Sequence, residues 1–179
     1  MKSLAIPNTG EPNLTKRDWP LWSRFGKSTT AGKEMLNQDF KEFIASLNDN
    51  RVRYLVVGGY AVAFHGHPRY TKDIDIWLQC SAQNAECVLQ ALRQFGFGSL
   101  DIEKQDFLTP DIIVQLGYPP RRIDLLTSLP GVDFEECYAQ RVQATVDGID
   151  VSFIDVENLK KNKRAAGRHQ DLADVDSLG

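Results

Sequence analysis

The stretch that most constrains the fold is residues 52–78, VRYLVVGGYAVAFHGHPRYTKDIDIWL. It begins with an apolar, β-branched run that ends abruptly at Gly58-Gly59, and a small-residue segment with helical spacing follows. After the turn-prone Gly66-His67-Pro68, residues 73–78 alternate between polar and apolar side chains. This order predicts a strand, a glycine turn, a short helix and a second strand, so we expect an α/β protein.

The second strand carries two aspartates. Side chains of a strand alternate between faces, so Asp73 and Asp75 project together while Ile74 and Ile76 enter a core. Two like charges on a largely buried strand are costly unless a cation lies between them. The pair therefore predicts half of a divalent-metal site that faces the glycine turn. The alternative is an exposed edge strand with solvated carboxylates, but the apolar residues that follow favour a central strand.

A third carboxylate, Asp124, stands within another apolar strand, RIDLL. If this strand lies beside residues 73–78, three carboxylates converge on one face of the sheet. Hard cations such as Mg²⁺ prefer oxygen ligands, and three carboxylates could hold two ions about 3.5–4 Å apart for an in-line phosphoryl displacement. The alternative for Asp124 is a salt bridge to Arg121 or Arg122.

The Gly58-Gly59 turn supplies the complement to these carboxylates. A strand, a glycine turn and a helix bring free backbone N–H groups and a positive helix end to one point, where phosphate binds well. Glycine lets the phosphate approach the backbone closely. A glycine pair alone often serves only to turn the chain, and the third glycine of a dinucleotide fingerprint is absent. Together with the aspartates downstream, the pair predicts a phosphate site.

With Arg69-Tyr70-Thr71-Lys72 before the Asp-x-Asp, this pattern resembles the DNA polymerase β-type nucleotidyltransferase superfamily, and Asp124 stands where that superfamily keeps its third carboxylate. The closer likeness is to the small bacterial branch related to abortive-infection toxins of type IV toxin–antitoxin pairs. That branch adds an Asp-x4-Lys motif, matched by Asp155 and Lys160, and a basic helix with acidic residues, matched by residues 163–171. The likeness covers roughly residues 36–176. One departure is Gly59, where the superfamily commonly has a serine hydroxyl that could touch the triphosphate.

The resemblance implies a nucleotidyltransferase fold, a small mixed β-sheet flanked by helices, and transfer of a nucleoside monophosphate from an NTP to an acceptor hydroxyl. Catalysis and metal binding fall to Asp73, Asp75 and Asp124, with two Mg²⁺ ions, or Mn²⁺ in their place. The implied partners are an NTP, an acceptor (a tRNA or RNA end, a protein or a small molecule) and a cognate antitoxin or toxin protein. The alternative outside enzymes is a toxin–antitoxin partner that binds nucleotide with little or no turnover. The implied nucleotide-binding residues are Gly58, Gly59, Arg69, Thr71, Lys72 and Lys160. The alternative for Arg69 and Lys72 is a solvated loop cation, and for Lys160 a surface charge of its helix.

The chain divides into an arm and a domain. Residues 1–33 show no sustained periodicity and are expected to be a poorly structured arm whose Trp19, Trp22 and Phe25 could dock on the body. Gly26-Lys27-Ser28 imitates the end of a P-loop, but the glycine required five residues earlier is Leu21, so it is expected to be a loop. Residues 34–179 are expected to form a single domain.

Within the domain, periodicity and capping residues define the remaining elements. Asp147-Gly148 predicts a hairpin turn. Leu172 and Val175 are expected to close the core, and residues 97–105 to be a short strand or loop. Helices are expected at 34–47 (closed by 48–50), 60–65, 81–96 and 134–138 and after the cap Asp155, and strands at 52–57, 73–78, 112–116, 122–127, 143–146 and 149–154.

The bulk composition narrows the setting. A net charge of −3 gives no global field for nucleic acid, so any RNA contact needs a local basic patch. No apolar run approaches the roughly 20 residues that span a bilayer, and the N-terminus lacks a signal-peptide pattern. We therefore expect a cytoplasmic protein without a membrane partner. Lys161, Lys163, Arg164 and Arg168 are expected to form a solvated face that is the best local candidate for RNA contact.

The cysteines and histidines are expected to be structural. Cys80, Cys87 and Cys137 form neither a CxxC pair nor an even set, which indicates reduced thiols with inert packing roles. His65 and His67 are expected to be hydrogen-bonded structural residues and not metal ligands, because the neighbouring carboxylates already suit a hard ion.

Overall fold

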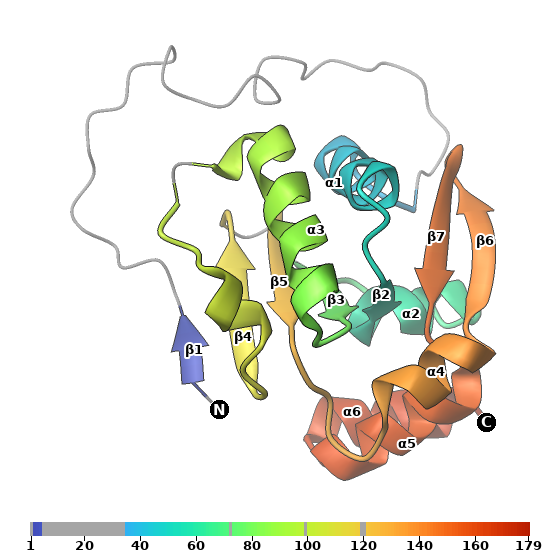
Figure 1. The fold of residues 1–179 in the computed structure, drawn as a ribbon. Helices are drawn as coiled ribbons and strands as arrows, with labels where there is room; N and C mark the ends of the chain where they lie inside the picture. Colours follow the sequence, from blue (N-terminus) through green and yellow to red (C-terminus); the bar gives the residue numbers. More distant parts are fainter. Residues whose placement is uncertain (1, 5–34, 72, 99, 119–120) are drawn as a thin grey trace.

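A seven-stranded mixed sheet runs through the part of the chain that the computed structural model describes, residues 2–4, 35–71, 73–98, 100–118 and 121–179 (Figure 1). The strand order is β1-β4-β5-β3-β2-β7-β6. The central strands β3 and β5 are parallel neighbours, whereas β2 is antiparallel to β3 and parallel to β7. The strands are β1 (Lys2–Leu4), β2 (Tyr54–Val57), β3 (Asp73–Leu78), β4 (Ile112–Leu116), β5 (Arg122–Leu126), β6 (Val142–Val146) and β7 (Ile149–Phe153).

Helices flank the sheet, so the predicted α/β architecture is confirmed. In Figure 1, α1 and α3 lie across one face, and α5 and α6 lie together at one end of the molecule. None of the described helices is long and apolar enough to cross a membrane. The helices are α1 (Gln38–Asp49), α2 (Gly58–Phe64), α3 (Ala82–Leu92), α4 (Phe134–Gln140), α5 (Val156–Ala166) and α6 (His169–Ser177), with a π-helical turn at Arg93–Phe97 and a 3-10 turn at Lys104–Phe107.

Local capping explains where several helices begin and end. The Ser81 hydroxyl accepts a hydrogen bond from the Asn84 amide at the start of α3, and Asp155 accepts bonds from two amides at the start of α5, as predicted. Asn37 caps the start of α1, and the last residue Asp49 and the C-cap Asn50 lie within the predicted closing segment. The Asp147-Gly148 turn joins β6 to β7 with both residues at positive φ, which confirms the predicted hairpin.

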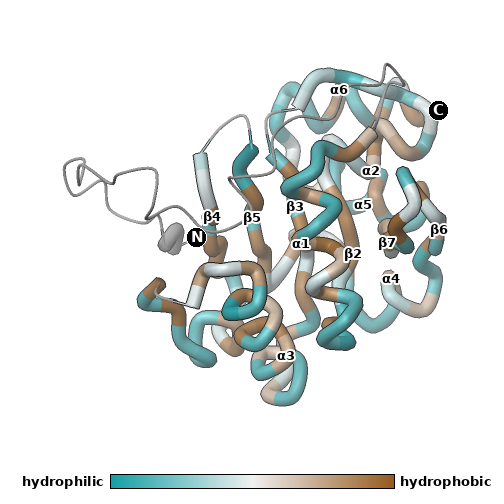
Figure 2. The backbone as a smooth tube through the Cα atoms, turned by 90° about the horizontal axis from the view of Figure 1, so that it is seen from above, coloured by the Kyte–Doolittle hydropathy of each residue, from teal (hydrophilic) through white to brown (hydrophobic). Residues whose placement is uncertain are grey.

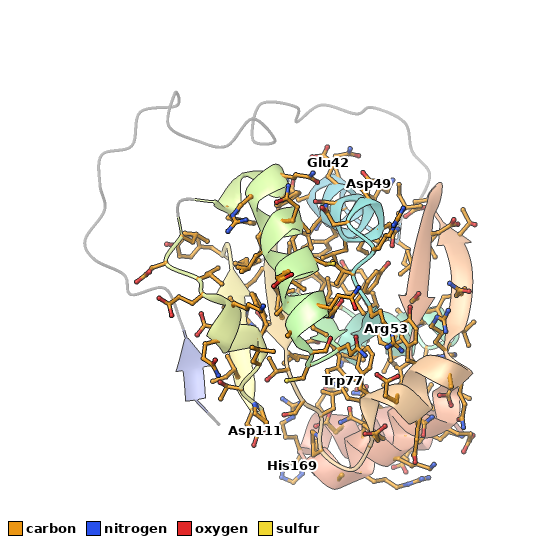
Figure 3. The ribbon with its side chains drawn as sticks, in the orientation of Figure 1. Glu42, Asp49, Arg53, Trp77, Asp111 and His169 are labelled. Atoms are coloured by element: carbon orange, nitrogen blue, oxygen red, sulfur yellow. The ribbon has the colours of Figure 1, made fainter. Side chains whose placement is uncertain are left out.

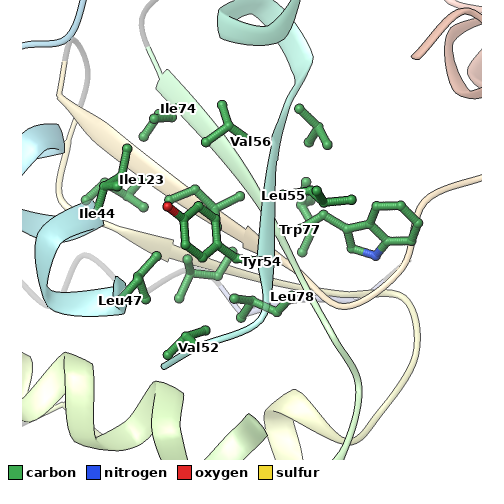
Figure 4. Close-up of a cluster of buried hydrophobic side chains, with 14 of the residues drawn as sticks. Ile44, Leu47, Val52, Tyr54, Leu55, Val56, Ile74, Trp77, Leu78 and Ile123 are labelled. Carbon is green, nitrogen blue, oxygen red and sulfur yellow. The ribbon is translucent and has the colours of Figure 1, made fainter. Parts of the chain in front are cut away.

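The hydrophobic core fills the space between the sheet and helices α1 and α3. Ile44 and Leu47 of α1 lie over the central strands, where Val56, Ile74 and Leu78 are at most 1% exposed (Figure 4). In Figure 2 the hydrophobic stretches gather along the central strands. Burial of these side chains is the main stabilising contribution of the sheet, at roughly 1.5–3 kcal/mol for each fully buried side chain.

The far end of β3 is anchored by aromatic contacts around α4 (Figure 3). Trp77 meets the Phe134 ring edge-on at 5.0 Å between ring centroids. The Arg53 guanidinium lies 4.4 Å from the Tyr138 ring centroid and pairs with Glu135 at 2.7 Å. A cation over an aromatic face is stabilised electrostatically, so this end of the strand is held by packing, while its other end carries the aspartates.

The structure corrects several expectations. Leu172 is 45% exposed and does not close the core. The last helix is two helices, because Gly167 adopts a left-handed conformation (φ 67°) that ends α5 and turns the chain back as α6. Cys80 is exposed; inert packing describes Cys137, whose burial raises its thiol pKa to about 12.

Two further expectations concern residues 1–33. Lys2–Leu4, within the stretch expected to lack structure, forms β1 parallel to β4. The proposed docking of Trp19, Trp22 and Phe25, and the loop at Gly26-Lys27-Ser28, lie outside the described residues.

Candidate active site

The three predicted carboxylates lie on neighbouring strands. In the parallel pairing of β3 with β5, Asp75 is opposite Asp124 and Asp73 is opposite Arg122. The intervening Ile74 and Ile76 are completely buried on the other face. The predicted adjacency of the two strands is therefore confirmed, and its cause is the two-residue period that sends aspartates to one face and aliphatic side chains to the other.

Asp75 lies directly against the glycine turn. Val57 is opposite Asp75 in the antiparallel pairing of β2 with β3, so Gly58 follows beside the carboxylate. A Cβ on Gly58 would lie 1.9 Å from Asp75 Oδ2, and Gly58 has a φ of 62°. Both the close approach and the backbone conformation require glycine here.

Asp75 lies in a cluster of carboxylates that has too little positive charge near it. Burial, together with the charges of Asp73 and Asp124, raises the pKa of Asp75 to about 7, against the opposing effects of Arg168 and Lys163. A like-charged carboxylate in a partly buried site holds its proton unless a cation arrives. The oxygen donors of this cluster therefore have the chemistry that a hard divalent cation prefers.

Thr71 and Arg69 cover Gly59. A Cβ on Gly59 would lie 2.9 Å from the Thr71 hydroxyl oxygen and 3.4 Å from Arg69 Nη1. The Thr71 hydroxyl donates to the Asp73 side chain at 3.1 Å, which places it between the turn and the carboxylates. The hydroxyl that Gly59 lacks is thus present at this point on another residue. Gly58, Gly59, Arg69 and Thr71, four of the predicted nucleotide-binding residues, come together around one end of β3.

The structure does not place the other two predicted nucleotide-binding residues, Lys160 and Lys72, at the glycine turn. The Lys160 ammonium donates to the Gly179 carbonyl at 2.5 Å and to Glu157 at 3.2 Å, and no contact among the described residues joins it to the glycine turn. The prediction that Lys160 binds the triphosphate therefore receives no geometric support. Lys72 lies outside the described residues.

A chain of ion pairs near the site was missed by sequence reasoning. Arg69 binds Asp174 through two hydrogen bonds of 2.9 and 3.0 Å, and Lys163 binds both Asp174 at 2.7 Å and Asp171 at 3.1 Å. Arg168 closes the chain on Asp171 at 2.6 Å. The expectation that Lys163 is solvated is wrong: only 3% of it is exposed.

This ion chain depends on the turn between α5 and α6. Gly167 reverses the chain, and residues i and i+3 of a helix share a face, so Asp171 and Asp174 point together toward Lys163. Burial opposes ionisation, but hydrogen bonds from Arg168 and Lys163 lower the pKa of Asp171, and those from Arg69, Lys163 and Gln170 lower that of Asp174. The signal in the sequence was the glycine followed by two acids three residues apart.

Arg122 lies among the carboxylates. Its guanidinium donates to Asp73 at 2.5 Å and to the two oxygens of Asp124 at 2.7 and 2.8 Å. Within the described part of the chain no three Asp, Glu, His or Cys side chains stand together as a ready metal site. The donor set fits a divalent cation chemically, but Arg122 holds oxygens of Asp73 and Asp124 that such an ion would use.

The two histidines serve different purposes. His65 Nε2 lies 2.8 Å from the Ile154 carbonyl, which confirms a structural role. His67 is exposed and lines a cavity of about 430 Å³ between the loop after α2 and helix α6, together with Arg69, Gln170 and Asp174. Because Arg69 also reaches Gly59, this cavity adjoins the glycine turn.

Comparison with known proteins gives a family and weak structural likenesses. No curated protein matches the chain. An antigenic nucleotidyltransferase-like protein from Paracoccidioides brasiliensis is similar in structure, with 15% sequence identity, a TM-score of 0.46, and coverage of 80% of this chain and 77% of that one. The family model described as a nucleotidyltransferase of unknown function (DUF6036) matches residues 34–179, and the chain therefore belongs to this nucleotidyltransferase family.

Proposed function

We propose that this protein is a Mg²⁺-dependent nucleotidyltransferase that transfers a nucleoside monophosphate from an NTP to an acceptor hydroxyl and releases pyrophosphate. The observation that carries the proposal is the meeting of Asp73, Asp75 and Asp124 on one surface beside Gly58. Membership of a nucleotidyltransferase family is consistent with it. Two Mg²⁺ ions are proposed as cofactors, with Mn²⁺ as a substitute.

One set of residues is proposed to bind the triphosphate, and Asp124 is proposed to act on the acceptor hydroxyl. The backbone amides at Gly58 and Gly59, the Thr71 hydroxyl and Arg69 Nη1 border one space in which the triphosphate is proposed to bind. Asp124 is proposed to accept the proton of the acceptor hydroxyl. The hydroxyl oxygen then forms a bond to the α-phosphorus of the NTP, and the bond from the α-phosphorus to the pyrophosphate oxygen breaks. When bound, divalent cations supply Lewis acidity at the phosphate and lower the pKa of the acceptor hydroxyl.

The acceptor is proposed to be an RNA or tRNA end, a protein or a small molecule, and the protein a cytoplasmic component of a toxin–antitoxin pair. The resemblance of the motifs to abortive-infection toxins supports this finer assignment. Lys161, Arg164 and Arg168, on α5 and the α5–α6 turn, are exposed and are the remaining candidates for RNA contact, since Lys163 is buried.

A second candidate is a partner protein that binds nucleotide without turnover. The observation that favours it is the hydrogen bonding of Arg122 to both Asp73 and Asp124, which satisfies these carboxylates without a metal. The two candidates differ in whether pyrophosphate is released.

The test is incubation of the protein with each labelled NTP, Mg²⁺ and total cell RNA or lysate, with pyrophosphate and labelled acceptor measured. Asp73→Asn and Asp124→Asn are expected to abolish both signals, whereas Asp176→Asn, on the exposed side of α6, is expected to leave them unchanged. Nucleotide-dependent thermal stabilisation without pyrophosphate release would favour the non-catalytic candidate. Turnover that survives both substitutions would overturn the proposed site.

A further inference from the structure

The guanidinium of Arg122 lies between Asp73 and Asp124 on the carboxylate face. Arg122 and Asp124 are two residues apart on β5, so both side chains leave the same face, and Asp73 is the cross-strand partner of Arg122. The side chain bonds Asp124 through Nε and Nη2 and Asp73 through Nη2. One cation thus bridges two strands at the position where a shared metal ion would bridge them.

The bridge satisfies only part of the cluster. A guanidinium carries one positive charge, while the face presents three carboxylates, and Asp75 is not among the contacts of Arg122. Two oxygens of Asp124 and one of Asp73 are engaged, and Gln115 adds a bond to Asp124 at 3.3 Å. A divalent ion and the guanidinium would therefore need the same oxygens, and both cannot bind them at once.

We propose that Arg122 is a built-in counter-ion that competes with divalent cations for Asp73 and Asp124, so that a cation enters only when the guanidinium turns away. This inference rests on the proposed function, because it concerns the same carboxylates. The Arg122 side chain is 26% exposed, which gives the guanidinium a path toward solvent. Arg122 acts here as a positioning residue that sets the affinity of the site for cations.

A purely structural salt bridge predicts a different outcome. If Arg122 only tied β3 to β5, its removal would lower stability and leave three repelling carboxylates without any gain in cation binding. Competition predicts a gain, because the cation no longer has to displace the guanidinium. Hydrogen bonds between a guanidinium and carboxylates are among the strong ones, so the loss of this competitor is expected to raise the affinity for the cation at least about tenfold.

The experiment measures Mn²⁺ binding to the metal-free full chain by isothermal titration calorimetry and by the electron paramagnetic resonance signal of free Mn²⁺. Arg122→Gln is expected to bind Mn²⁺ at least about tenfold more tightly than the unmodified protein. The matched control is Arg121→Gln, since Arg121 is the preceding residue in the chain and its 64% exposed side chain pairs with Asp39. This control is expected to bind like the unmodified protein. Equal or weaker binding by Arg122→Gln would overturn the inference.

Two further variants separate this inference from the proposed function. Arg122→Lys keeps the charge but has a single nitrogen, which cannot reproduce the three-contact bridge; it is expected to bind Mn²⁺ with an intermediate affinity, and it serves the same test if Arg122→Gln does not fold by circular dichroism. Asp75→Asn is expected to weaken binding in either background. If Arg122 variants bind like the unmodified protein while Asp75→Asn still weakens binding, the competition fails and the metal site stands. If no variant binds Mn²⁺, both fail.

Discussion

Replacing Gly58 with alanine tests the contact on which the site is built, that between the glycine turn and Asp75. The added Cβ would lie 1.9 Å from Asp75 Oδ2 and 2.8 Å from its Cγ, far inside van der Waals contact. Gly58 also has a φ of 62°, a conformation that costs an L-residue roughly 1–2 kcal/mol. The carboxylate must move or the strands must separate, and such overpacking adds about 1–3 kcal/mol.

Together these terms predict that Gly58→Ala lowers the free energy of unfolding by roughly 2–5 kcal/mol. Gly148→Ala is the matched control, because Gly148 has a φ of 85° and a Cβ added there would meet no described residue within 4 Å. Gly148→Ala strains the backbone without any steric clash, so it is expected to lower the free energy of unfolding by about 1–2 kcal/mol.

A double-mutant cycle separates the two contributions. In a protein that also carries Asp75→Ala, Gly58→Ala no longer meets the carboxylate, and only the contact with the Asp75 Cβ at 3.1 Å remains. The cost of Gly58→Ala is then expected to fall to that of the Gly148 control, with a coupling of about 1–3 kcal/mol. Urea unfolding followed by circular dichroism provides the four free energies. An equal cost with and without the Asp75 carboxylate would refute the packing of this side chain on the turn.

Three further predictions concern the charged residues. The pKa of Asp75 is higher in the folded protein (about 7) than in the unfolded chain, so its bound proton stabilises the fold at low pH. This stabilisation is lost as the pH rises through 7, by up to about 1.4 kcal/mol per pH unit. In urea titrations from pH 4 to 8, the free energy of unfolding of Asp75→Asn should depend less on pH than that of the unmodified protein. Lys163→Met should cost about 3–5 kcal/mol because it leaves buried carboxylates unpaired, whereas Arg164→Met, exposed and next in the chain, should stay within about 0.5 kcal/mol in thermal denaturation. Asp171 and Asp174 have lowered pKa values, so their stabilisation is present above the pKa of the unfolded chain and is lost as the pH falls through the folded values; acid unfolding of Asp171→Asn should be less steep, and an unchanged acid profile would contradict the ion-pair assignment.

Much of the fold followed from short-range pattern. The alternation in DIDIWL assigned faces to β3 before any partner strand was known, because the period of a strand depends only on its own backbone. Ser81 and Asp155 marked helix starts because an N-cap acts within three residues. Asp147-Gly148 marked a hairpin for the same reason.

The site was predictable only as far as its residues are close in sequence or share a strand period. Asp73, Asp75 and Asp124 could be named as candidates, and their adjacency required only that β5 pair with β3. For the lysines, the sequence did not show that Lys160 bonds to Glu157 and Gly179 while Lys163 enters the buried ion chain. Residues three apart share a helix face, so their spacing alone could not distinguish Lys160 from Lys163; only the packing of α6 shows that Lys163 is the one that meets the acids.

By itself, then, the sequence determined the faces of the strands, the capped starts of α3 and α5 and the presence of an acidic pair after a glycine turn, because each depends on interactions within a few residues. The tertiary structure alone decided that Thr71 covers Gly59, that Asp174 holds Arg69 and Lys163, and that Arg122 lies among the carboxylates. These contacts join segments up to 105 residues apart. Their geometry is set by how strands and helices pack, and no local pattern in the chain encodes it.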